Sequence, residues 1–315
     1  MAINLKELSK KPIPISPGHR ACAGCGSIIT IKLVLMAAED PIVCACATGC
    51  MEVVTTIYPY TSWRVPFMHN AFENAAATLS GIESAYRSLK RQGRIGKDIK
   101  FIAFGGDGGS YDIGLQSLSG AMERGHDMLY VCYDNEAYMN TGIQRSGSTP
   151  LCAATSTSPV GKVAQGKKQY PKDLTRIMAA HRIPYIAQAS PHRWLDLMTK
   201  VQKALRIEGP KFINAISSCH RGWRVPMSNS LEVCRMAVET CFWPLFEIED
   251  GVWRLNYRPR AKVPIIEWFK TQKRFQHLLK PENAPMVAEI QADVDRRWNE
   301  LLHLCGEKTE QVERG

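Results

Sequence analysis

Long apolar runs are missing from this chain of 315 residues. No stretch of eighteen or more apolar residues occurs, so no membrane-spanning helix is predicted. The first eighteen residues contain lysines but no apolar core, so we expect no secretory signal peptide. Repeats and nucleic-acid-binding motifs are also lacking, although the net charge is +10. The charge therefore indicates a basic surface that meets acidic partners, with no nucleic acid and no membrane among them.

Only one Cys-x-x-Cys pair is present, Cys22 with Cys25, although the chain has eleven cysteines. Without an export signal, so many cysteines favour a cytoplasmic location and metal or cluster ligands or buried thiols over disulfides. The pair alone fits zinc, redox thiols or iron–sulfur ligation. The lack of a second pair weakens the prediction of a four-cysteine zinc ribbon.

What the chain does contain, between residues 100 and 144, is the pattern of a strand–helix–strand unit. An apolar run, Phe101 to Phe104, ends in the glycine loop Gly105 to Gly109. Apolar residues at helical spacing follow from Ile113 to Met122. A second apolar run, Met128 to Tyr133, then ends in Asp134-Asn135-Glu136. At 45% hydrophobic residues, the chain can bury a large core around such units.

The glycine loop is unusual because it contains a carboxylate, Asp107. Glycines let backbone N–H groups approach a diphosphate, and the following helix adds a favourable dipole. Asp107 would repel that diphosphate unless a divalent cation lay between them. Asp107 and Asn135 both follow strands, so they can supply oxygen ligands to such a magnesium ion. The loop fits neither a Walker loop nor Gly-x-Gly-x-x-Gly, and by itself it fits a plain tight turn equally well.

A wider pattern resembles a known family. Asn135 follows Asp107 by 28 residues, as in the thiamin diphosphate and magnesium motif of the thiamin enzymes. The segments GDGGSYDIGLQSLSGAMERGH and CYDNEAYMNTGIQRSGSTP resemble the β subunit of the 2-oxoacid:ferredoxin oxidoreductases, in the branch of pyruvate synthase and oxalate oxidoreductase. The resemblance runs from about Pro17 to the early 260s. It implies an α/β fold with a doubly wound, mostly parallel sheet of the thiamin diphosphate-binding type.

The resemblance also assigns cofactor residues. Magnesium would be held by Asp107, Asn135 and the carbonyl group of Ala137. Thiamin diphosphate would lie against the two loops that carry these ligands, at Gly106, Asp107, Gly108, Gly109, Asn135, Ala137, Asn140 and Thr141.

One 4Fe–4S cluster is implied as well, held by Cys22, Cys25, Cys50 and Cys219. The residue pattern agrees, because Cys50 and Cys219 each follow a strand-like run, as Asp107 does, and such loops share one edge of a doubly wound sheet. Zinc is the alternative metal. The other cysteines fit packing thiols: Cys44, Cys46, Cys132, Cys152, Cys234, Cys241 and Cys305. Three of them, Cys44, Cys46 and Cys132, lie inside apolar strand-like runs, where cysteine packs as a small hydrophobic residue.

Two further segments are candidates for the site. Polar side chains gather between residues 60 and 77, where Arg64, His69 and Glu73 are candidate catalytic residues, although each also fits a structural role. The segment from Gly142 to Gln169 is rich in Ser, Thr, Gly and Pro and predicts a long ordered loop around the site, or a lid.

We divide the chain into an N-terminal arm (1–17), a cofactor and cluster domain (18–242) and a C-terminal arm (243–315). The C-terminal arm would contain a hairpin around Glu249-Asp250-Gly251 and two helices, Ile265 to Leu279 and Pro285 to Leu304. We expect this arm to contact partner subunits, because it has more aromatic residues than a solvated tail needs.

The implied reaction is the oxidative decarboxylation of a small 2-oxoacid, with electrons passing through the cluster to ferredoxin. An α-type subunit would supply the pyrimidine-binding domain, and γ- or δ-type subunits would carry further clusters. His220 and Arg221 stand where pyruvate synthases usually have Pro and Thr, which slightly favours oxalate over pyruvate with coenzyme A. A non-redox thiamin enzyme of the acetolactate synthase kind and a cysteine-metal binding module are the alternative functions.

Overall fold

The computed structural model describes residues 3–309. One eight-stranded sheet crosses the molecule in the order β2-β1-β3-β4-β6-β5-β7-β8. The first six strands in this order are parallel to one another, and β7 and β8 are antiparallel. The predicted doubly wound, mostly parallel sheet is confirmed. The strands are β1 (Ile42–Ala47), β2 (Phe67–Asn70), β3 (Lys100–Gly106), β4 (Leu129–Asp134), β5 (Tyr185–Ala189), β6 (Lys211–Ile216), β7 (Phe246–Glu249) and β8 (Val252–Leu255).

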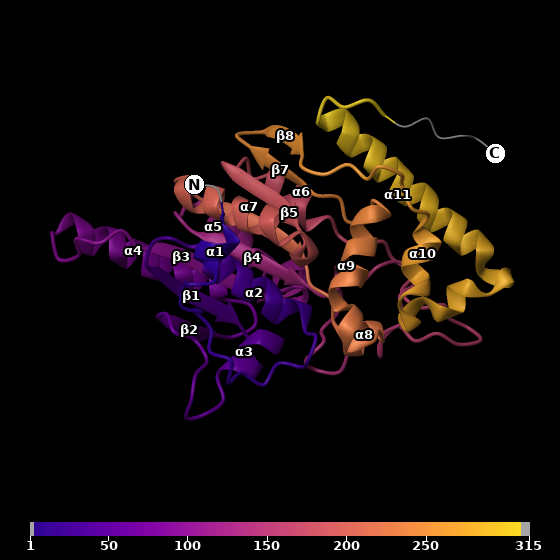
Figure 1. Cartoon of the computed structure of the whole chain (residues 1–315), viewed down its shortest axis with the longest axis horizontal. Coiled ribbons are helices and arrows are strands. Elements are labelled where there is room, and N and C mark those ends of the chain that lie inside the picture. The colour runs from indigo at the N-terminus through magenta and orange to yellow at the C-terminus, as the bar shows by residue number, and fades with distance from the viewer. Residues whose placement is uncertain (1–2, 310–315) are drawn as a thin grey trace.

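Helices cover both faces of the sheet (Figure 1). Along β3, Phe101 and Ala103 enter one core while Ile102 and Phe104 enter the other. A parallel strand covered on both faces has few polar residues, which explains the apolar runs in the sequence. The α-helices are α1 (Leu5–Leu8), α2 (Gly26–Ala37), α3 (Cys50–Thr55), α4 (Ala75–Arg91), α5 (Leu115–Glu123), α6 (Leu174–Ala179), α7 (Trp194–Arg206), α8 (His220–Trp223), α9 (Ser230–Glu239), α10 (Ile265–Lys270) and α11 (Ala284–Leu304).

Two of these helices, α2 and α7, pack on one face of the sheet, and α4, α5, α6, α9, α10 and α11 pack on the other. The amphipathic pattern of α7 shows why: Leu197, Val201 and Ala204 are buried at spacings of four and three residues. Within the described residues no helix is long and apolar enough to cross a membrane.

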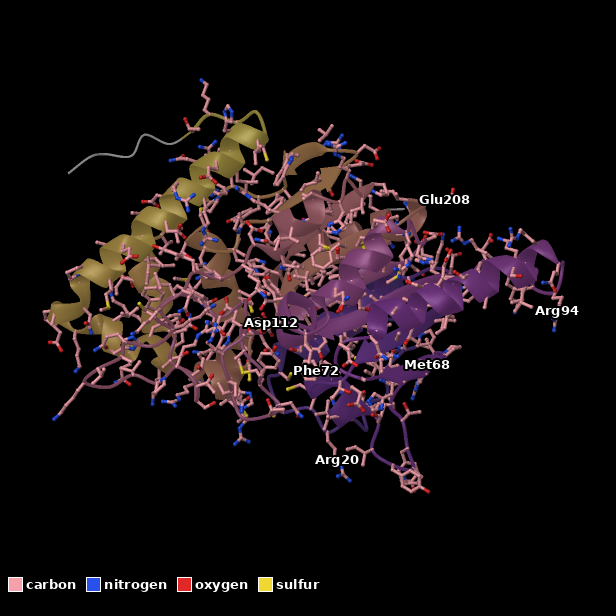
Figure 2. The ribbon with its side chains drawn as sticks, turned by 180° about the vertical axis from the view of Figure 1, so that it is seen from behind. Arg20, Met68, Phe72, Arg94, Asp112 and Glu208 are labelled. Atoms are coloured by element: carbon pink, nitrogen blue, oxygen red, sulfur yellow. The ribbon has the colours of Figure 1, made fainter. Side chains whose placement is uncertain are left out.

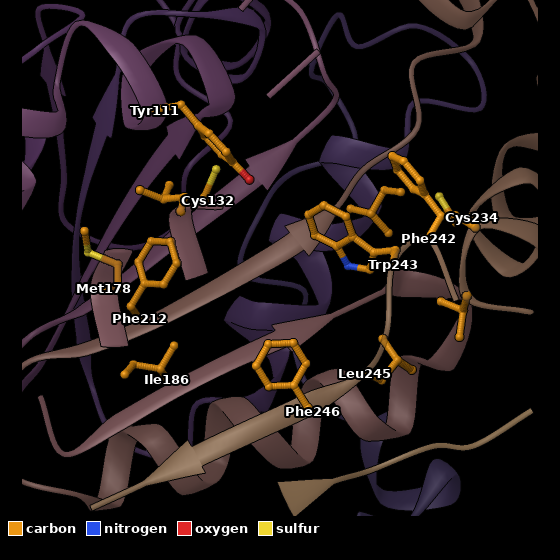
Figure 3. Close-up of a cluster of buried hydrophobic side chains, with 14 of the residues drawn as sticks. Tyr111, Cys132, Met178, Ile186, Phe212, Cys234, Phe242, Trp243, Leu245 and Phe246 are labelled. Atoms are coloured by element: carbon orange, nitrogen blue, oxygen red, sulfur yellow. The ribbon is translucent and has the colours of Figure 1, made fainter. Parts of the chain in front are cut away.

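The C-terminal hairpin belongs to the main sheet. We expected it in a separate arm, but β7 pairs with β5 in antiparallel register, from Tyr185 opposite Glu249 to Gln188 opposite Phe246. Figure 3 shows Phe246 and Trp243 in one cluster with Phe212 of β6. The predicted boundary between residues 242 and 243 therefore does not divide the chain into two separate cores. The contact of segment 243–315 with partner subunits stays a prediction, and residues 310–315 lie outside the described part.

The helices that follow the hairpin join the same core through Trp268 and Trp298, which are 0% and 1% exposed. The expected continuous helix from Ile265 to Leu279 is wrong. α10 ends at Lys270, Gln272 adopts an extended conformation, and a 3-10 helix runs from Lys273 to Leu279. This bend turns Arg274 toward the sheet, where its side chain is buried.

The described part of the predicted N-terminal arm, residues 3–17, packs on its own chain at its end. Ile15 is 2% exposed and forms a bridge with Trp63. The segment then leads directly to the first cysteine pair. Residues 1–2 of the arm lie outside the described residues.

Candidate cofactor and cluster site

Four neighbouring strands bring the predicted site residues together. β1, β3, β4 and β6 are consecutive in the sheet and parallel. Within three residues of their carboxyl ends come, in the same order, Cys50, Asp107, Asn135 and Cys219. The carboxyl edge of a parallel sheet is where ligands bind in doubly wound folds. The predicted placement of these loops at one edge is confirmed.

The glycines after β3 are required by close packing. β3 ends at Gly106, and the chain enters a short π-helix, Gly108–Asp112, without a left-handed residue. A Cβ atom on Gly108 would lie 2.4 Å from the Tyr138 ring. On Gly109 it would lie 3.2 Å from the Phe72 carbonyl oxygen. The Tyr138 ring therefore approaches Gly108 more closely than a Cβ atom would allow, and the Phe72 carbonyl leaves little room at Gly109.

The three predicted magnesium ligands meet at one point. The Asn135 side-chain amide lies 2.9 Å from Asp107 Oδ1 and 2.8 Å from the Ala137 carbonyl oxygen. With its nitrogen toward them, the amide donates two hydrogen bonds. With its oxygen toward them, three oxygens converge at about the spacing of adjacent ligands around a magnesium ion bound at about 2.0–2.1 Å. This donor set fits a hard divalent cation.

The electrostatics of Asp107 point the same way. The side chain is 1% exposed, and its Oδ2 makes no well-formed hydrogen bond within residues 3–309. Burial, followed by the charge of Asp134, raises the pKa of Asp107. A buried carboxylate beside a second carboxylate is costly unless a cation balances it. A bound cation would supply that balance.

A cavity opens beside these ligands, and every residue predicted to contact the cofactor lines it: Gly106, Asp107, Gly108, Gly109, Asn135, Ala137, Asn140 and Thr141. Tyr138 and Met139 line it as well. Thr48, Gly49, Cys50, Phe72 and Tyr133 complete the lining. The Tyr133 hydroxyl is buried and has no hydrogen-bond partner among the described residues. It is therefore available to a ligand in the cavity. Asn140 and Thr141 are exposed at its mouth.

The cysteines fall into two groups. None of the eleven forms a disulfide within residues 3–309, and the four predicted cluster ligands are among the five that are not buried, the fifth being Cys305. Local contacts hold the cysteine loops together. Gly24, between Cys22 and Cys25, has φ +73°, and a Cβ there would lie 2.3 Å from the Met227 carbonyl oxygen. The Gly26 N–H donates to the Ser218 carbonyl oxygen at 3.0 Å, next to Cys219.

The four thiols also influence one another. Burial, then the charges of the other three predicted cluster ligands and of Asp107, raises the pKa of Cys50 to about 12. Neighbouring thiolates repel one another, so a shared metal group is what would hold them deprotonated. Within residues 3–309, no three His, Cys, Asp or Glu side chains gather closely enough to bind one metal ion. A 4Fe–4S cluster takes one thiolate per iron and needs a wider arrangement of ligands than a single zinc ion. The choice between the cluster and the zinc alternative stays a prediction.

The three candidate catalytic residues lie at or beyond the rim. Arg64, His69 and Glu73 are all exposed. Only His69 connects with the cavity, because its Nε2 lies 3.1 Å from Oγ1 of Thr48, which lines it. Its Nδ1 lies 3.4 Å from Oε1 of the buried Glu52. A catalytic role for any of the three stays a prediction.

The predicted long loop after Asn140 is fixed against the site by buried hydrogen bonds. The Ser148 hydroxyl donates to the Asp134 carboxylate at 2.7 and 2.6 Å, and the Thr149 hydroxyl donates to the Glu136 carbonyl at 2.7 Å. Lys167 Nζ is buried and donates to the Thr149 carbonyl at 2.6 Å. This part of the segment is ordered against the site, which agrees with the first of our two interpretations. A role as a lid is not tested by these contacts.

Sequence reasoning missed several residues of the site. Phe72, Tyr133 and Tyr138 line the cavity, but an aromatic residue beside a strand end gives no sign of where its ring points. It also missed Arg274, which reaches the site from the C-terminal segment and pairs with Glu136. Its 138-residue separation from Glu136 leaves no local pattern.

The fold and the site together define a thiamin diphosphate-binding enzyme. Residues 47–215, more than half of the chain, match the family described as "Thiamine pyrophosphate enzyme, C-terminal TPP binding domain". The matched segment begins at the last residue of β1 and ends within β6, so it contains three of the four loops that build the site, those with Cys50, Asp107 and Asn135.

Full-length relatives narrow the class. The chain is 53% identical to pyruvate synthase subunit PorB of Thermotoga maritima, over 96% of this chain and 97% of the relative. It is 54% identical to the same subunit of Methanocaldococcus jannaschii, over 90% and 94%. Ketoisovalerate oxidoreductase subunit VorB of Pyrococcus abyssi is 41% identical, over 91% and 92%. The chain belongs to the β subunits of the 2-oxoacid:ferredoxin oxidoreductases, as its motifs led us to expect, and is thus part of an oxidoreductase.

A solved structure agrees on the fold. The 2-oxoglutarate:ferredoxin oxidoreductase of Magnetococcus marinus superimposes with a TM-score of 0.54 at 20% identity, over 72% of this chain and 78% of that chain.

Proposed function

We propose that this chain carries thiamin diphosphate, Mg²⁺ and one 4Fe–4S cluster in a complex that oxidises pyruvate to acetyl-coenzyme A and carbon dioxide. The observation that supports this best is the order of the loops on four consecutive strands. Two predicted magnesium ligands, Asp107 and Asn135, lie between two predicted cluster ligands, Cys50 and Cys219. The site where electrons are released therefore adjoins the site that accepts them.

The chain's own residues would hold the cofactor as follows. Asp107, Asn135 and the Ala137 carbonyl bind the magnesium ion, which neutralises the diphosphate. The backbone from Gly106 to Gly109 approaches the phosphates, and the Tyr133 hydroxyl donates into the same cavity. When bound, thiamin diphosphate supplies a carbanion that adds to the 2-oxo carbon and an electron sink for decarboxylation.

Electrons would leave through Cys22, Cys25, Cys50 and Cys219 toward an acidic carrier. Cys22 is exposed, and three exposed arginines, Arg20, Arg221 and Arg224, belong to the cysteine loops or follow them closely. A positive rim around an exit point attracts an acidic iron–sulfur protein and orients it. Ferredoxin, or a δ-type subunit that carries further clusters, has this chemistry.

Pyruvate replaces oxalate as the substrate we favour. The expectation for oxalate rested on His220 and Arg221 as cationic side chains. Arg221, however, is exposed. Burial and the charge of Arg221 lower the pKa of His220, which disfavours its charged form. Two relatives named as pyruvate synthase subunits are also 53% and 54% identical to this chain, against 41% for the ketoisovalerate oxidoreductase subunit. Each pyruvate and coenzyme A would yield acetyl-coenzyme A, carbon dioxide, one proton and two electrons, which two one-electron acceptors take up.

The complex needs other subunits. The described residues form a single sheet, with a single diphosphate-type motif. We propose that an α-type subunit supplies the pyrimidine-binding domain and that γ- and δ-type subunits complete the assembly. Eleven cysteines without a disulfide within residues 3–309 suit a reducing compartment, so we place the complex in the cytoplasm.

The test is anaerobic reduction of methyl viologen by the intact complex, with pyruvate, 2-oxoisovalerate, 2-oxoglutarate or oxalate, each with and without coenzyme A. We expect rapid reduction with pyruvate only when coenzyme A is present. Reduction by oxalate without coenzyme A would restore the oxalate assignment. Thiamin diphosphate bound to a complex that contains no iron would favour a non-redox thiamin enzyme, and iron without thiamin diphosphate would favour a cysteine-metal module.

A further inference from the structure

Arg274 is a buried cation that the proposed chemistry has not yet used. It lies on the 3-10 helix Lys273–Leu279 and is 2% exposed. Its guanidinium group forms an ion pair with Glu136 and lies 4.1 Å from the centre of the Trp223 ring. Its Nε donates to Gln272 Oε1 at 2.7 Å. A cation in such surroundings is costly to bury, so its partners must compensate for the loss of water.

The two partners of Arg274 belong to the two halves of the site. Glu136 stands between the magnesium ligands Asn135 and Ala137, and Trp223 ends the short helix that begins after Cys219. The Trp223 Nε1–H donates to the Asn135 carbonyl oxygen at 2.8 Å. Arg274, Trp223, Asn135 and Glu136 therefore form a closed set of contacts that ties the magnesium-ligand loop to the cluster-ligand loop.

The backbone of Glu136 needs such support. Its φ is +64°, in the left-handed region that L-residues with a Cβ rarely occupy. Conformations of this kind persist where the surrounding contacts enforce them. The ion pair with Arg274 and the hydrogen bond from Thr149 to the Glu136 carbonyl both hold this residue in place.

We propose that Arg274 is a positioning residue that fixes the magnesium-ligand loop against the cluster-ligand loop, and that its positive charge favours the reduced cluster. The inference rests on the proposed function, because it needs both cofactors. A fixed loop keeps Asn135 and Ala137 directed at the metal. Reduction adds one negative charge near Cys219, and a buried cation close by stabilises that charge.

Charge and shape both favour arginine at this position. Burial lowers the pKa of Arg274, while the charges of Glu136 and then of Cys219 oppose that effect. The guanidinium group also lies over Trp268 and Phe275, at 5.6 and 4.9 Å from the ring centres. A lysine keeps the charge but cannot stack as a plane while binding a carboxylate. Arg274→Lys should therefore separate the electrostatic role from the positioning role.

The experiment compares three variants of the intact complex, Arg274→Gln, Arg274→Lys and Glu136→Gln. Three quantities are measured: iron content, the Mg²⁺ concentration needed to retain thiamin diphosphate, and the cluster midpoint potential from an EPR-monitored redox titration. Lys200→Met is the matched control, because Lys200 is also a buried cation, but it bonds to Asp196 and the Gln188 carbonyl. It should leave all three quantities unchanged.

For Arg274→Gln we expect normal iron, a Mg²⁺ requirement about ten- to a hundredfold higher, and a lower midpoint potential. Arg274→Lys should keep the potential and lose part of the Mg²⁺ affinity. Glu136→Gln should shift the potential upward, because the cation then lacks its counter-charge. Opposite shifts for the two partners are a signature that general loosening of the structure does not produce.

Wild-type potential and Mg²⁺ affinity in Arg274→Gln would overturn the proposal. If that variant does not assemble, Trp223→Phe decides the positioning role, because it removes the N–H to Asn135 and keeps an aromatic ring beside Arg274. It should weaken Mg²⁺ binding and leave the potential near wild type, and unchanged Mg²⁺ binding would overturn the positioning role. A wild-type complex that lacks iron or thiamin diphosphate would instead contradict the proposed function.

Discussion

The two ends of the parallel strands carry charge in different ways. At the amino end, β6 begins with the buried Lys211, which forms an ion pair with Asp127. At the carboxyl end, the buried acids Asp107 and Asp134 stand close together, and the charge of Asp134 raises the pKa of Asp107. Figure 2 shows both regions: Glu208 precedes β6 at one end of the molecule, while Phe72 follows β2 near the site.

This difference separates charged groups that stabilise the fold from charged groups that are available for function. At the amino end, the buried Lys211 is paired with Asp127 of the same chain, so the fold alone accounts for this pair. After the strands, Asp107 Oδ2 and the Tyr133 hydroxyl are buried without well-formed partners in residues 3–309. Proteins accept such costs where a ligand repays them. These two groups are what the proposed cation and diphosphate would satisfy at the carboxyl end.

The largest predicted effect comes from the magnesium ligand. Asp107→Ala should lose more than about a hundredfold in affinity for Mg²⁺ and thiamin diphosphate, because a direct ligand matters more than its supporting partners. Equilibrium dialysis of the intact complex measures both. Asp127→Ala is the control at the amino end: it should lower stability and keep cofactor binding. Equal loss of cofactor in the two variants would contradict the comparison.

The next effect concerns the two groups of cysteines. Cys219→Ala should lose iron and ferredoxin reduction while thiamin diphosphate stays bound. Cys234→Ala, in the buried core, should keep its iron and lose about 1 kcal/mol of stability. Iron analysis and thermal unfolding measure the two outcomes. Unchanged iron and unchanged ferredoxin reduction in Cys219→Ala would exclude the four-cysteine assignment.

A smaller effect is expected from the glycine loop. In Gly108→Ala the added methyl group would press on the Tyr138 ring, so thiamin diphosphate should bind about tenfold more weakly. Gly81→Ala is the matched change, because no atom lies within 4 Å of a Cβ there, in the interior of α4. It should stabilise the protein by about 0.5–1 kcal/mol and leave the cofactor unaffected. Wild-type affinity for thiamin diphosphate in Gly108→Ala would show that the packing of Tyr138 against residue 108 tolerates a methyl group.

The smallest effect tests the proposed exit for electrons. Arg221→Glu should slow ferredoxin reduction about threefold to tenfold at low salt, because it weakens attraction to an acidic carrier. Reduction of methyl viologen should be unchanged, since it needs no docking surface. Arg94→Glu, an equally exposed change near the amino ends, should affect neither rate. A loss that persists at high salt would argue against electrostatic docking at Arg221.

The sequence was most informative where contacts are local. Apolar or strand-like runs located β1, β3, β4 and β6, the four strands that carry the site, and the spacing from Asp107 to Asn135 located the site. The short strand β2 was missed, because Phe67–Asn70 is an edge strand with exposed residues and no apolar run. The pairing of β7 with β5 and the contact of Arg274 with Glu136 join residues far apart in the chain. The spacing of apolar residues along the chain does not indicate contacts between distant segments, so only the structure reveals them.

One measurement tests the central claim that the thiamin diphosphate site and the cluster share this edge and act together. Pyruvate and coenzyme A are mixed anaerobically with the intact complex, and the visible iron–sulfur absorbance is followed with time. We predict rapid bleaching in the wild type and none in Asp107→Ala, which should keep its iron and its absorbance. Bleaching in Asp107→Ala at the wild-type rate would contradict the account, because electrons would then reach the cluster without this site.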